Sequence, residues 1–197
     1  PCVEDLECNP ATLYAKTKLQ GEQIVKDTLE QYTILRPATA YGLSFKTRHN
    51  LLIHTLCHDA VKGGRIDLYQ PDAKRTFYHV NDLAKACIHF MLSYNEKSPV
   101  NIGTGKDISI HELATEIKKI VGFEGKILWD KNKPDGTPRK LMDVSKMKAM
   151  GWQYTTELEE GIQKTYKWYL KNIDNIKEIK LKKKHLLQGL LDKTDLI

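Results

Sequence analysis

Residues 100–129 read VNIGTGKDISIHELATEIKKIVGFEGKILW. The apolar run at 100–102 ends at a Gly-Thr-Gly turn, as a short buried strand does. Ser109 and Glu112 have the spacing of a capping box, in which each side chain bonds the other residue's backbone, and they predict a helix that runs to about Val121. A second short strand closes the stretch. The segment therefore predicts a strand, a helix and a strand in succession.

The same alternation extends along most of the chain. Helical periodicity predicts helices at 9–29, 50–61, 83–92 and 156–170, with start signals at Asn9-Pro10, at Asn81-Asp82 and in a Thr156-to-Glu159 capping box. Short runs of β-branched and aromatic residues predict strands at 32–36, 65–69, 75–80 and 126–129, and Pro and Gly predict an irregular stretch at 131–140. This alternation predicts an α/β fold with a mainly parallel sheet.

The composition excludes several classes of protein. Of the 197 residues, 41% are hydrophobic and 28% are charged, which is enough to bury a core and excludes disordered and fibrous chains. No apolar run approaches the roughly 18 residues of a membrane span, so we expect no membrane partner.

The net charge of +6 is concentrated toward the C-terminus. Residues 171–197 contain the run Lys180–Lys184 and are expected to form a basic helical tail. Blocks of like charge are usually solvated, so we prefer this interpretation to a nucleic-acid-binding surface.

Cysteine and histidine usage predicts neither a disulfide framework nor a metal site. The four cysteines form no CxxC pair, which favours a reducing cytoplasm. His54, Cys57 and His58 share a predicted helix, but no fourth ligand with suitable spacing follows, so we expect no metal.

Tyr14 and Lys18 are the strongest candidates for chemistry. Residues four apart on a helix share a face. A neighbouring ammonium favours the phenolate, so this phenol could donate or accept a proton at a sugar hydroxyl or carbonyl. A Tyr and a Lys four residues apart are also common on surface helices that have no chemical role. The surrounding motifs must therefore decide between a catalytic pair and an ordinary surface pair.

Those motifs occur in a recognisable order. They are Pro1, Glu4, Asn9-Pro10, Tyr14, Lys18, Thr33–Pro37, Tyr41-Gly42, Arg75–Val80 and Asp82. In this order and spacing, residues 1–170 resemble the extended short-chain dehydrogenases/reductases, the NAD-dependent epimerase/dehydratase family that acts on nucleotide sugars. The resemblance implies the C-terminal part of a Rossmann-like parallel sheet with a smaller α/β substrate-binding domain.

The second half of the chain resembles one family within this larger group. Its matching segments are Lys133–Val144, Ser145-Lys146, Gly151-Trp152, Leu158–Gly161 and Thr165–Trp168. They are similar to the C-terminal domain of the GDP-L-fucose synthase family. Residues 35–44 are closer to other epimerases, because fucose synthases usually have Asn at the position of Thr39. A nucleotide-sugar 4-epimerase or dehydratase therefore remains an alternative.

The resemblance implies roles for individual residues. Tyr14 matches the catalytic acid/base, Lys18 matches its partner, which also binds the nicotinamide ribose, and His49 matches an epimerisation residue. Pro37, Ala38, Thr39 and Ala40 match the loop beside the nicotinamide, and Tyr69, Arg75 and Asp135 match residues that hold the GDP-sugar. The implied cofactor is NAD or NADP, with NADPH expected in a fucose synthase. Without the resemblance, Arg75 could pair with a surface acid and Asp135 could simply start a turn.

A dinucleotide-binding half is expected in front of Pro1, because the Gly-rich turn of such a site is absent here. The expected division is a Rossmann-like remainder at 1–62 and 76–104, a substrate domain at 63–75 and 105–170, and the tail at 171–197. A cytoplasmic enzyme with a nucleotide-sugar substrate, forming a possible homodimer, is the favoured hypothesis. A sugar-nucleotide-binding fragment without chemistry and an RNA-binding chain are the alternatives.

Overall fold

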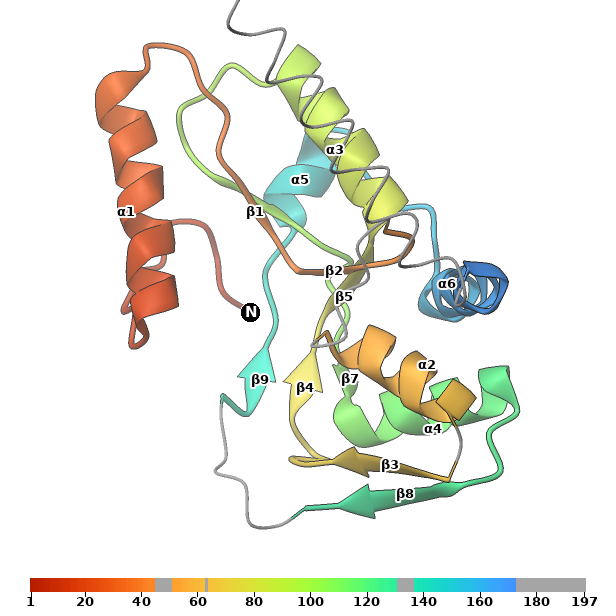
Figure 1. Cartoon of the computed structure of the whole chain (residues 1–197). Helices are drawn as coiled ribbons and strands as arrows, with labels where there is room; N and C mark the ends of the chain where they lie inside the picture. The colour runs from red at the N-terminus through yellow and green to blue at the C-terminus, as the bar shows by residue number, and fades with distance from the viewer. Residues whose placement is uncertain (45–50, 63, 131–136, 173–197) are drawn as a thin grey trace, which may run out of the picture.

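The computed structural model describes residues 1–44, 51–62, 64–130 and 137–172. Helices and strands alternate along this range (Figure 1). In chain order the elements are α1 (Leu13–Thr28), β1 (Leu35–Pro37), β2 (Thr39–Tyr41), α2 (Leu52–Lys62), β3 (Arg65–Leu68), β4 (Lys74–Arg75), β5 (Phe77–His79), α3 (Val80–Ser93), β6 (Val100–Ile102), β7 (Ile108–Ser109), α4 (Ile110–Val121), β8 (Lys126–Trp129), β9 (Arg139–Lys140), α5 (Ser145–Ala149) and α6 (Leu158–Asn172).

The described strands pair in small sheets that are mostly parallel. β1 pairs with β6, β2 with β5 and β3 with β8, each in parallel. β4 lies between β7, which is antiparallel to it, and β9, which is parallel. The prediction of an α/β fold with mainly parallel strands is confirmed.

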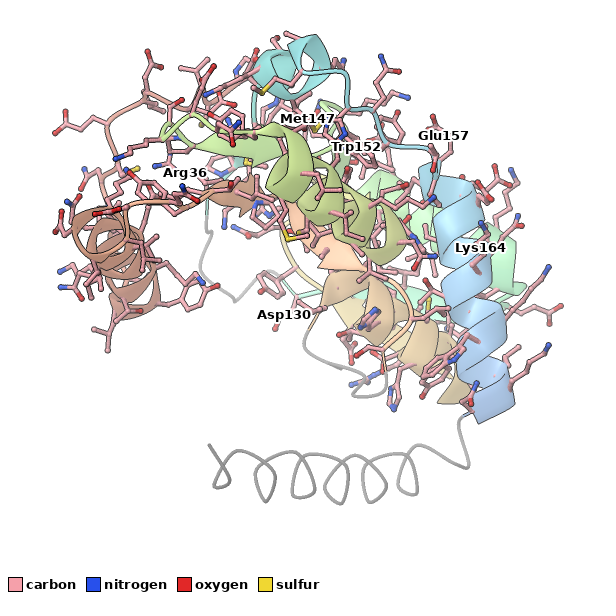
Figure 2. The ribbon with its side chains drawn as sticks, turned by 90° about the horizontal axis from the view of Figure 1, so that it is seen from above. Arg36, Asp130, Met147, Trp152, Glu157 and Lys164 are labelled. Carbon is pink, nitrogen blue, oxygen red and sulfur yellow. The ribbon has the colours of Figure 1, made fainter. Side chains whose placement is uncertain are left out.

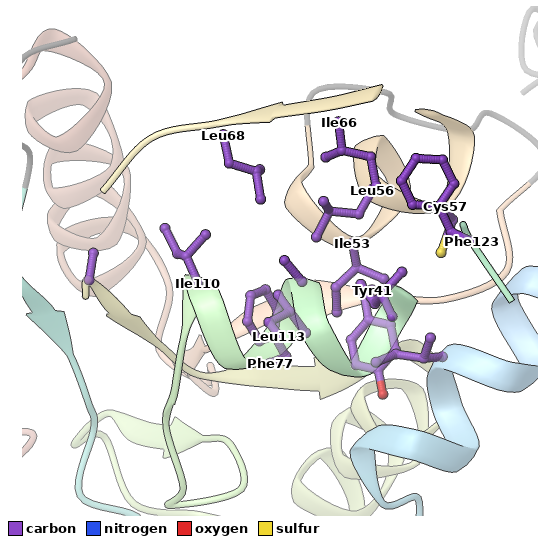
Figure 3. Close-up of a cluster of buried hydrophobic side chains, with 14 residues drawn as sticks. Tyr41, Ile53, Leu56, Cys57, Ile66, Leu68, Phe77, Ile110, Leu113 and Phe123 are labelled. Atoms are coloured by element: carbon purple, nitrogen blue, oxygen red, sulfur yellow. The ribbon is translucent and has the colours of Figure 1, made fainter. Parts of the chain in front are cut away.

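One hydrophobic core joins α2, α4 and α6 with β3, and we call it the α2–α4–α6 core (Figure 3). Ile53 and Leu56 of α2 meet Leu113 of α4 and Ile162 of α6, and all four side chains are fully buried or nearly so. α2, which lies in the segment 1–62 predicted to be Rossmann-like, thus shares a core with α4 and α6. The division into domains remains a prediction.

A second core, the α3 core, lies between α3, the β5 and β6 strands and α5. Tyr78, Phe90, Ile102 and Met147 are its largest fully buried members. Trp152 closes it and donates a hydrogen bond from Nε1 to the Tyr78 hydroxyl at 2.9 Å; Figure 2 shows it close to Met147. These contacts make Trp152 a packing residue of the α3 core.

Three predicted helix starts are wrong. α1 begins at Leu13 rather than at Asn9-Pro10, because the Thr12 hydroxyl accepts the Ala15 N–H. α3 begins at Val80 and is capped by His79 rather than by Asn81-Asp82. α6 begins at Leu158, and the Thr156 N–H expected in a capping box donates instead to Asp82.

The strand boundaries also differ from those predicted. The expected strand at 75–80 breaks at Thr76, whose buried hydroxyl donates to the Lys140 carbonyl at 3.2 Å. β1 includes Pro37, which lies opposite Ile102 and is tolerated because β6 is the only described strand that pairs with β1. Part of the stretch expected to be irregular forms β9, which pairs with β4.

Candidate active site

Tyr14 and Lys18 line a hollow of about 890 Å³ between α1 and β1. The four-residue spacing puts both side chains on one face of α1, as the sequence predicts. Tyr14 is 75% exposed, and Lys18 is also exposed. Pro37, at the end of β1, lines the same hollow. The structure therefore brings together three of the residues assigned to chemistry and cofactor binding.

The donor groups of this hollow fit the nicotinamide end of a dinucleotide. A phenol hydroxyl and an ammonium group lie on successive turns, and both can hydrogen-bond ribose hydroxyls. The volume of the hollow is within the range of small-molecule sites. Tyr14 and Lys18 are the residues that would hold the ribose, with Pro37 beside them.

The rest of the predicted nicotinamide loop turns away from the hollow. The Ala38 N–H donates to the Ile102 carbonyl at 2.8 Å, and Ala38 packs against the α3 core. Thr39 and Ala40 belong to β2, opposite Phe77 and Tyr78. None of these three residues lines the hollow.

The predicted substrate residues lie elsewhere. Arg75, on β4, lines a second hollow of about 470 Å³ that also contains Tyr41, Lys106 and Tyr154. Tyr69 follows β3 and is 43% exposed, and it lines neither hollow. His49 and Asp135 lie outside the described residues. The described part of the chain thus does not gather the predicted catalytic and substrate residues into one cavity.

The Arg75 guanidinium contacts backbone carbonyls. Its Nη1 donates to the Lys74 carbonyl at 2.8 Å and to the Pro138 carbonyl at 3.5 Å. No carboxylate of the described ranges forms an ion pair with it. The alternative of an Arg75 paired with a surface acid is not observed there, and its remaining N–H groups can donate to a ligand. Among the described residues, the hollow that Arg75 lines also contains the carboxylates of Asp107, Glu112, Glu116 and Glu157.

Two charged residues of the first hollow, Glu22 and Arg36, were assigned no role from the sequence. Glu22, one turn beyond Lys18, also lines the hollow and pairs with Arg36 of β1. The four-residue step from Lys18 to Glu22 was a usable signal, but the partner on β1 is remote in sequence and could not be recognised without the fold.

The residues considered for a metal site have other roles. His54 is buried, and its Nε2 accepts the Gly42 N–H at 3.3 Å. His58 Nδ1 lies 2.9 Å from Asp59 Oδ1. Burial raises the pKa of the Cys57 thiol to about 12, so this cysteine is a poor source of thiolate. Across the described ranges, no helix is long and apolar enough to cross a membrane.

The chain is similar in sequence to proteins named GDP-L-fucose synthase. GDP-L-fucose synthase 1 of Arabidopsis thaliana is 52% identical over 101 residues, which are 51% of this chain and 31% of that protein. GDP-L-fucose synthase of Escherichia coli (strain K12) is 35% identical over 185 residues, covering 83% of this chain and 58% of that protein. The chain thus spans between about a third and three fifths of the length of these relatives.

A solved structure and a family model also match this chain. The fold resembles UDP-glucose 4-epimerase of Thermotoga maritima, with a TM-score of 0.80, 22% identity, and coverage of 88% of this chain and 58% of that one. Residues 1–103, more than half of the chain, match the model of the NAD dependent epimerase/dehydratase family. These residues include Tyr14, Lys18 and the strand that leads to Pro37, and the chain therefore belongs to the NAD dependent epimerase/dehydratase family.

Proposed function

We propose that the full-length protein is an NAD(P)-dependent nucleotide-sugar epimerase/reductase of the GDP-L-fucose synthase type. The observation that carries the proposal is the placement of Tyr14 and Lys18 on one exposed face of α1, beside Pro37 in one hollow. The similarity to named GDP-L-fucose synthases supports the choice of substrate class.

In the proposed reaction, GDP-4-keto-6-deoxy-mannose is epimerised at C3 and C5 and then reduced at C4. The hydride comes from the nicotinamide cofactor, which would be NADPH. The Tyr14 hydroxyl donates a proton to the oxygen on C4, and the Lys18 ammonium stabilises the negative charge left on the phenol. We assign His49 to the epimerisation step.

Substrate binding is assigned to a second group of residues. Arg75 would hold the diphosphate, because a guanidinium can donate two parallel hydrogen bonds to phosphate oxygens. Tyr69 and Asp135 would contact the rest of the GDP-sugar. Pro37, Ala38, Thr39 and Ala40 would lie toward the nicotinamide.

The proposal also covers the compartment, the assembly and the domain roles of the enzyme. We place it in the cytoplasm, because the four cysteines form no CxxC pair and no dense framework of the kind that disulfide-bonded secreted domains have. A homodimer without nucleic-acid or membrane partners is the proposed assembly. The proposed division of labour assigns chemistry to the Rossmann-like part, residues 1–62 and 76–104, and sugar recognition to residues 63–75 and 105–170.

A 4-epimerase is the second candidate, favoured by Thr39, where fucose synthases usually have Asn. In that reaction Tyr14 first accepts a proton from the C4 hydroxyl and later returns it. The two candidates differ in their substrates and in net cofactor consumption, because only the reductase uses up NADPH.

The test uses the full-length natural protein with NADPH and GDP-4-keto-6-deoxy-mannose, and separately with NAD and UDP-hexoses. We expect NADPH consumption in the first assay and a loss of about 100- to 10,000-fold in kcat for Tyr14→Phe, since proton transfer contributes this much. Tyr32→Phe is the matched control, because Tyr32 lies outside the hollow. UDP-hexose interconversion without NADPH consumption would select the 4-epimerase, and wild-type protein inactive in both assays would refute the proposal.

A further inference from the structure

α1 lies at the edge of the described part of the chain. None of its residues is buried, and Figure 1 shows the helix standing to one side of both cores. Leu13, Tyr14 and Ile24 are more than 60% exposed. Within the described residues, the contacts that join α1 to β1 are therefore polar as well as hydrophobic, and the polar ones involve Glu22 and Arg36.

A bidentate ion pair joins this helix to β1. Arg36 Nε lies 3.0 Å from Glu22 Oε2, and Arg36 Nη2 lies 2.8 Å from Glu22 Oε1. Lys26 adds a third hydrogen bond to the Glu22 carboxylate at 2.8 Å. Two parallel bonds between planar groups restrict rotation as well as distance. Figure 2 labels Arg36 on the side of the chain where α1 lies.

The pair is anchored on the side of β1. Arg36 Nη1 donates to the Glu4 carbonyl at 2.9 Å, and the Glu4 side chain accepts the Asn101 N–H of β6 at 2.9 Å. Asn101 in turn donates to the carbonyls of Cys2 and Asp143 at 3.0 Å each. The position of Arg36 is thus fixed by the β1–β6 sheet, and Glu22 takes its position from Arg36.

The pair differs from an ordinary surface ion pair in its burial. The side chains of Glu22 and Arg36 are 12% and 26% exposed, whereas those of Lys164 and Glu160 on α6 are each 52% exposed. Burial alone would raise the pKa of Glu22, but the hydrogen bonds from Arg36 and Lys26 outweigh burial and lower it. Glu22 is therefore ionised at neutral pH, and the pair is a charged one.

The pair also has a direct geometric relation to the active-site residues. Tyr14, Lys18 and Glu22 follow one another at four-residue steps and share one face of α1. Arg36 directly precedes Pro37, and all five residues line the same hollow. Any rotation of α1 that separates Glu22 from Arg36 also moves Tyr14 and Lys18 relative to Pro37.

We propose that Glu22 and Arg36 are positioning residues that set the rotation of α1, and thereby the placement of Tyr14 and Lys18 against the substrate. This inference rests on the proposed function. A misplacement of about 1 Å can cost 100-fold in rate, so a pair that holds the helix through both oxygens of one carboxylate has a measurable catalytic effect.

The test measures kcat and KM in the full-length protein for Glu22→Gln, Arg36→Gln and the exchanged pair Glu22→Arg/Arg36→Glu. We expect kcat to fall about 10- to 100-fold in each single variant, with KM for the nucleotide sugar little changed, and the exchanged pair to recover part of the loss. Arg36→Lys should remain impaired, because a lysine cannot form both bonds.

Gln23→Ala is the matched control on the same helix. Gln23 Nε2 bonds Asp27 Oδ1 at 2.8 Å on the exposed side of α1, so its loss removes a helix contact without freeing the helix from β1. Its kcat should remain that of the wild type. The proposal is overturned if Glu22→Gln lowers the unfolding temperature while kcat of the folded protein stays at the wild-type value.

Hydrogen exchange gives a second measurement that does not depend on activity. The α1 amides should exchange faster in Glu22→Gln than in Gln23→Ala, and equal exchange would also overturn the proposal. If the wild-type protein is inactive, the proposed function fails, and the exchange measurement alone decides whether the pair fixes the helix.

Discussion

Two helix-interior glycines show how the same residue can be required at one site and replaceable at another. A Cβ on Gly161 of α6 would overlap the Tyr41 hydroxyl and lie 2.9 Å from Tyr41 Cζ. Tyr41 is 3% exposed and cannot easily move. A Cβ on Gly21 of α1 would have no described neighbour within 4 Å.

Gly161→Ala and Gly21→Ala should therefore change stability in opposite directions. Alanine gains about 1 kcal/mol over glycine in a helix, and Gly21→Ala should raise the unfolding free energy by up to that amount. For Gly161→Ala, overpacking of about 1–3 kcal/mol should exceed the gain, so that the protein is less stable. Urea unfolding of both variants measures this, and stabilisation by Gly161→Ala would contradict the packing described.

At the residue scale, the sequence predicts contacts between residues that are close together in the chain. Helix geometry puts Tyr14 and Lys18 on one face, and the ordered motifs around them assign the pair to chemistry. Arg36 was not assigned a role, because its partner Glu22 lies on another element and no local pattern marks a pair between elements. Thr39 and Ala40 were assigned to the nicotinamide loop by resemblance, and that assignment remains a prediction.

At the scale of elements, α3 depends on a histidine for its start. His79 Nδ1 accepts the Asn81 N–H at 3.4 Å, so the neutral ring carries its proton on Nε2. His79 is 2% exposed, and burial lowers its pKa below the ordinary 6.5, although Asp82 opposes the shift. The folded protein therefore holds His79 neutral at a pH where the unfolded chain already protonates it.

This difference predicts that stability falls in mild acid. Below pH 6.5 the unfolded state binds more protons at this site than the folded state does, so the unfolding free energy decreases as pH falls through 6.5 and is fully retained above it. His79→Asn keeps a capping side chain and should flatten this dependence, measured by urea unfolding between about pH 5 and pH 8.

Ser109→Ala serves as the control, because it removes the cap of α4 without removing a titratable group. Ser109→Ala should lower the unfolding free energy by about 1 kcal/mol at every pH in that interval. If His79→Asn and the wild type show the same pH dependence, His79 does not carry it.

Helix starts differ in how well the sequence predicts them. Ser109 and Glu112 form the expected capping box, because both partners are within one turn. The Thr156 start was wrong because Asp82, remote in sequence, takes the Thr156 N–H. β7 and β9 were missed because two-residue strands exist only through pairing with β4.

At the scale of the whole molecule, Asp82 links the two cores. It lies on α3 and is fully buried. Its carboxylate accepts the Thr155 hydroxyl at 2.8 Å and the Thr156 N–H at 2.9 Å, just before α6 of the other core. These hydrogen bonds lower its pKa although burial alone would raise it, so the carboxylate is charged at neutral pH.

Asp82→Ala should therefore lower the unfolding free energy by about 3 kcal/mol. The substitution leaves the Thr155 hydroxyl and the Thr156 N–H without their charged acceptor. Asp67→Ala is the matched control: Asp67 pairs with Arg65 at 3.0 Å, but both side chains are more than half exposed, and its loss should cost about 0.5 kcal/mol or less. Comparable losses of unfolding free energy in the two variants would show that Asp82 does not link the cores.

The alternation of helix and strand was sufficient to predict the α/β class of the molecule. It could not predict how the strands divide among small sheets, because that division depends on which strands become neighbours. It also could not assign α2 to the core with α4 and α6, since its apolar face would suit either neighbour.

The parallel pairing of strands has a consequence for how this chain reaches its fold. Leu35 lies opposite Val100, Thr39 opposite Phe77 and Arg65 opposite Lys126. Each sheet therefore closes a long loop before its first cross-strand hydrogen bond can form, and loop closure of this kind slows folding. The helices can form from local contacts much sooner. Refolding should be limited by the late meeting of remote strands, with helical signal recovered before the tertiary signal from the buried tyrosines.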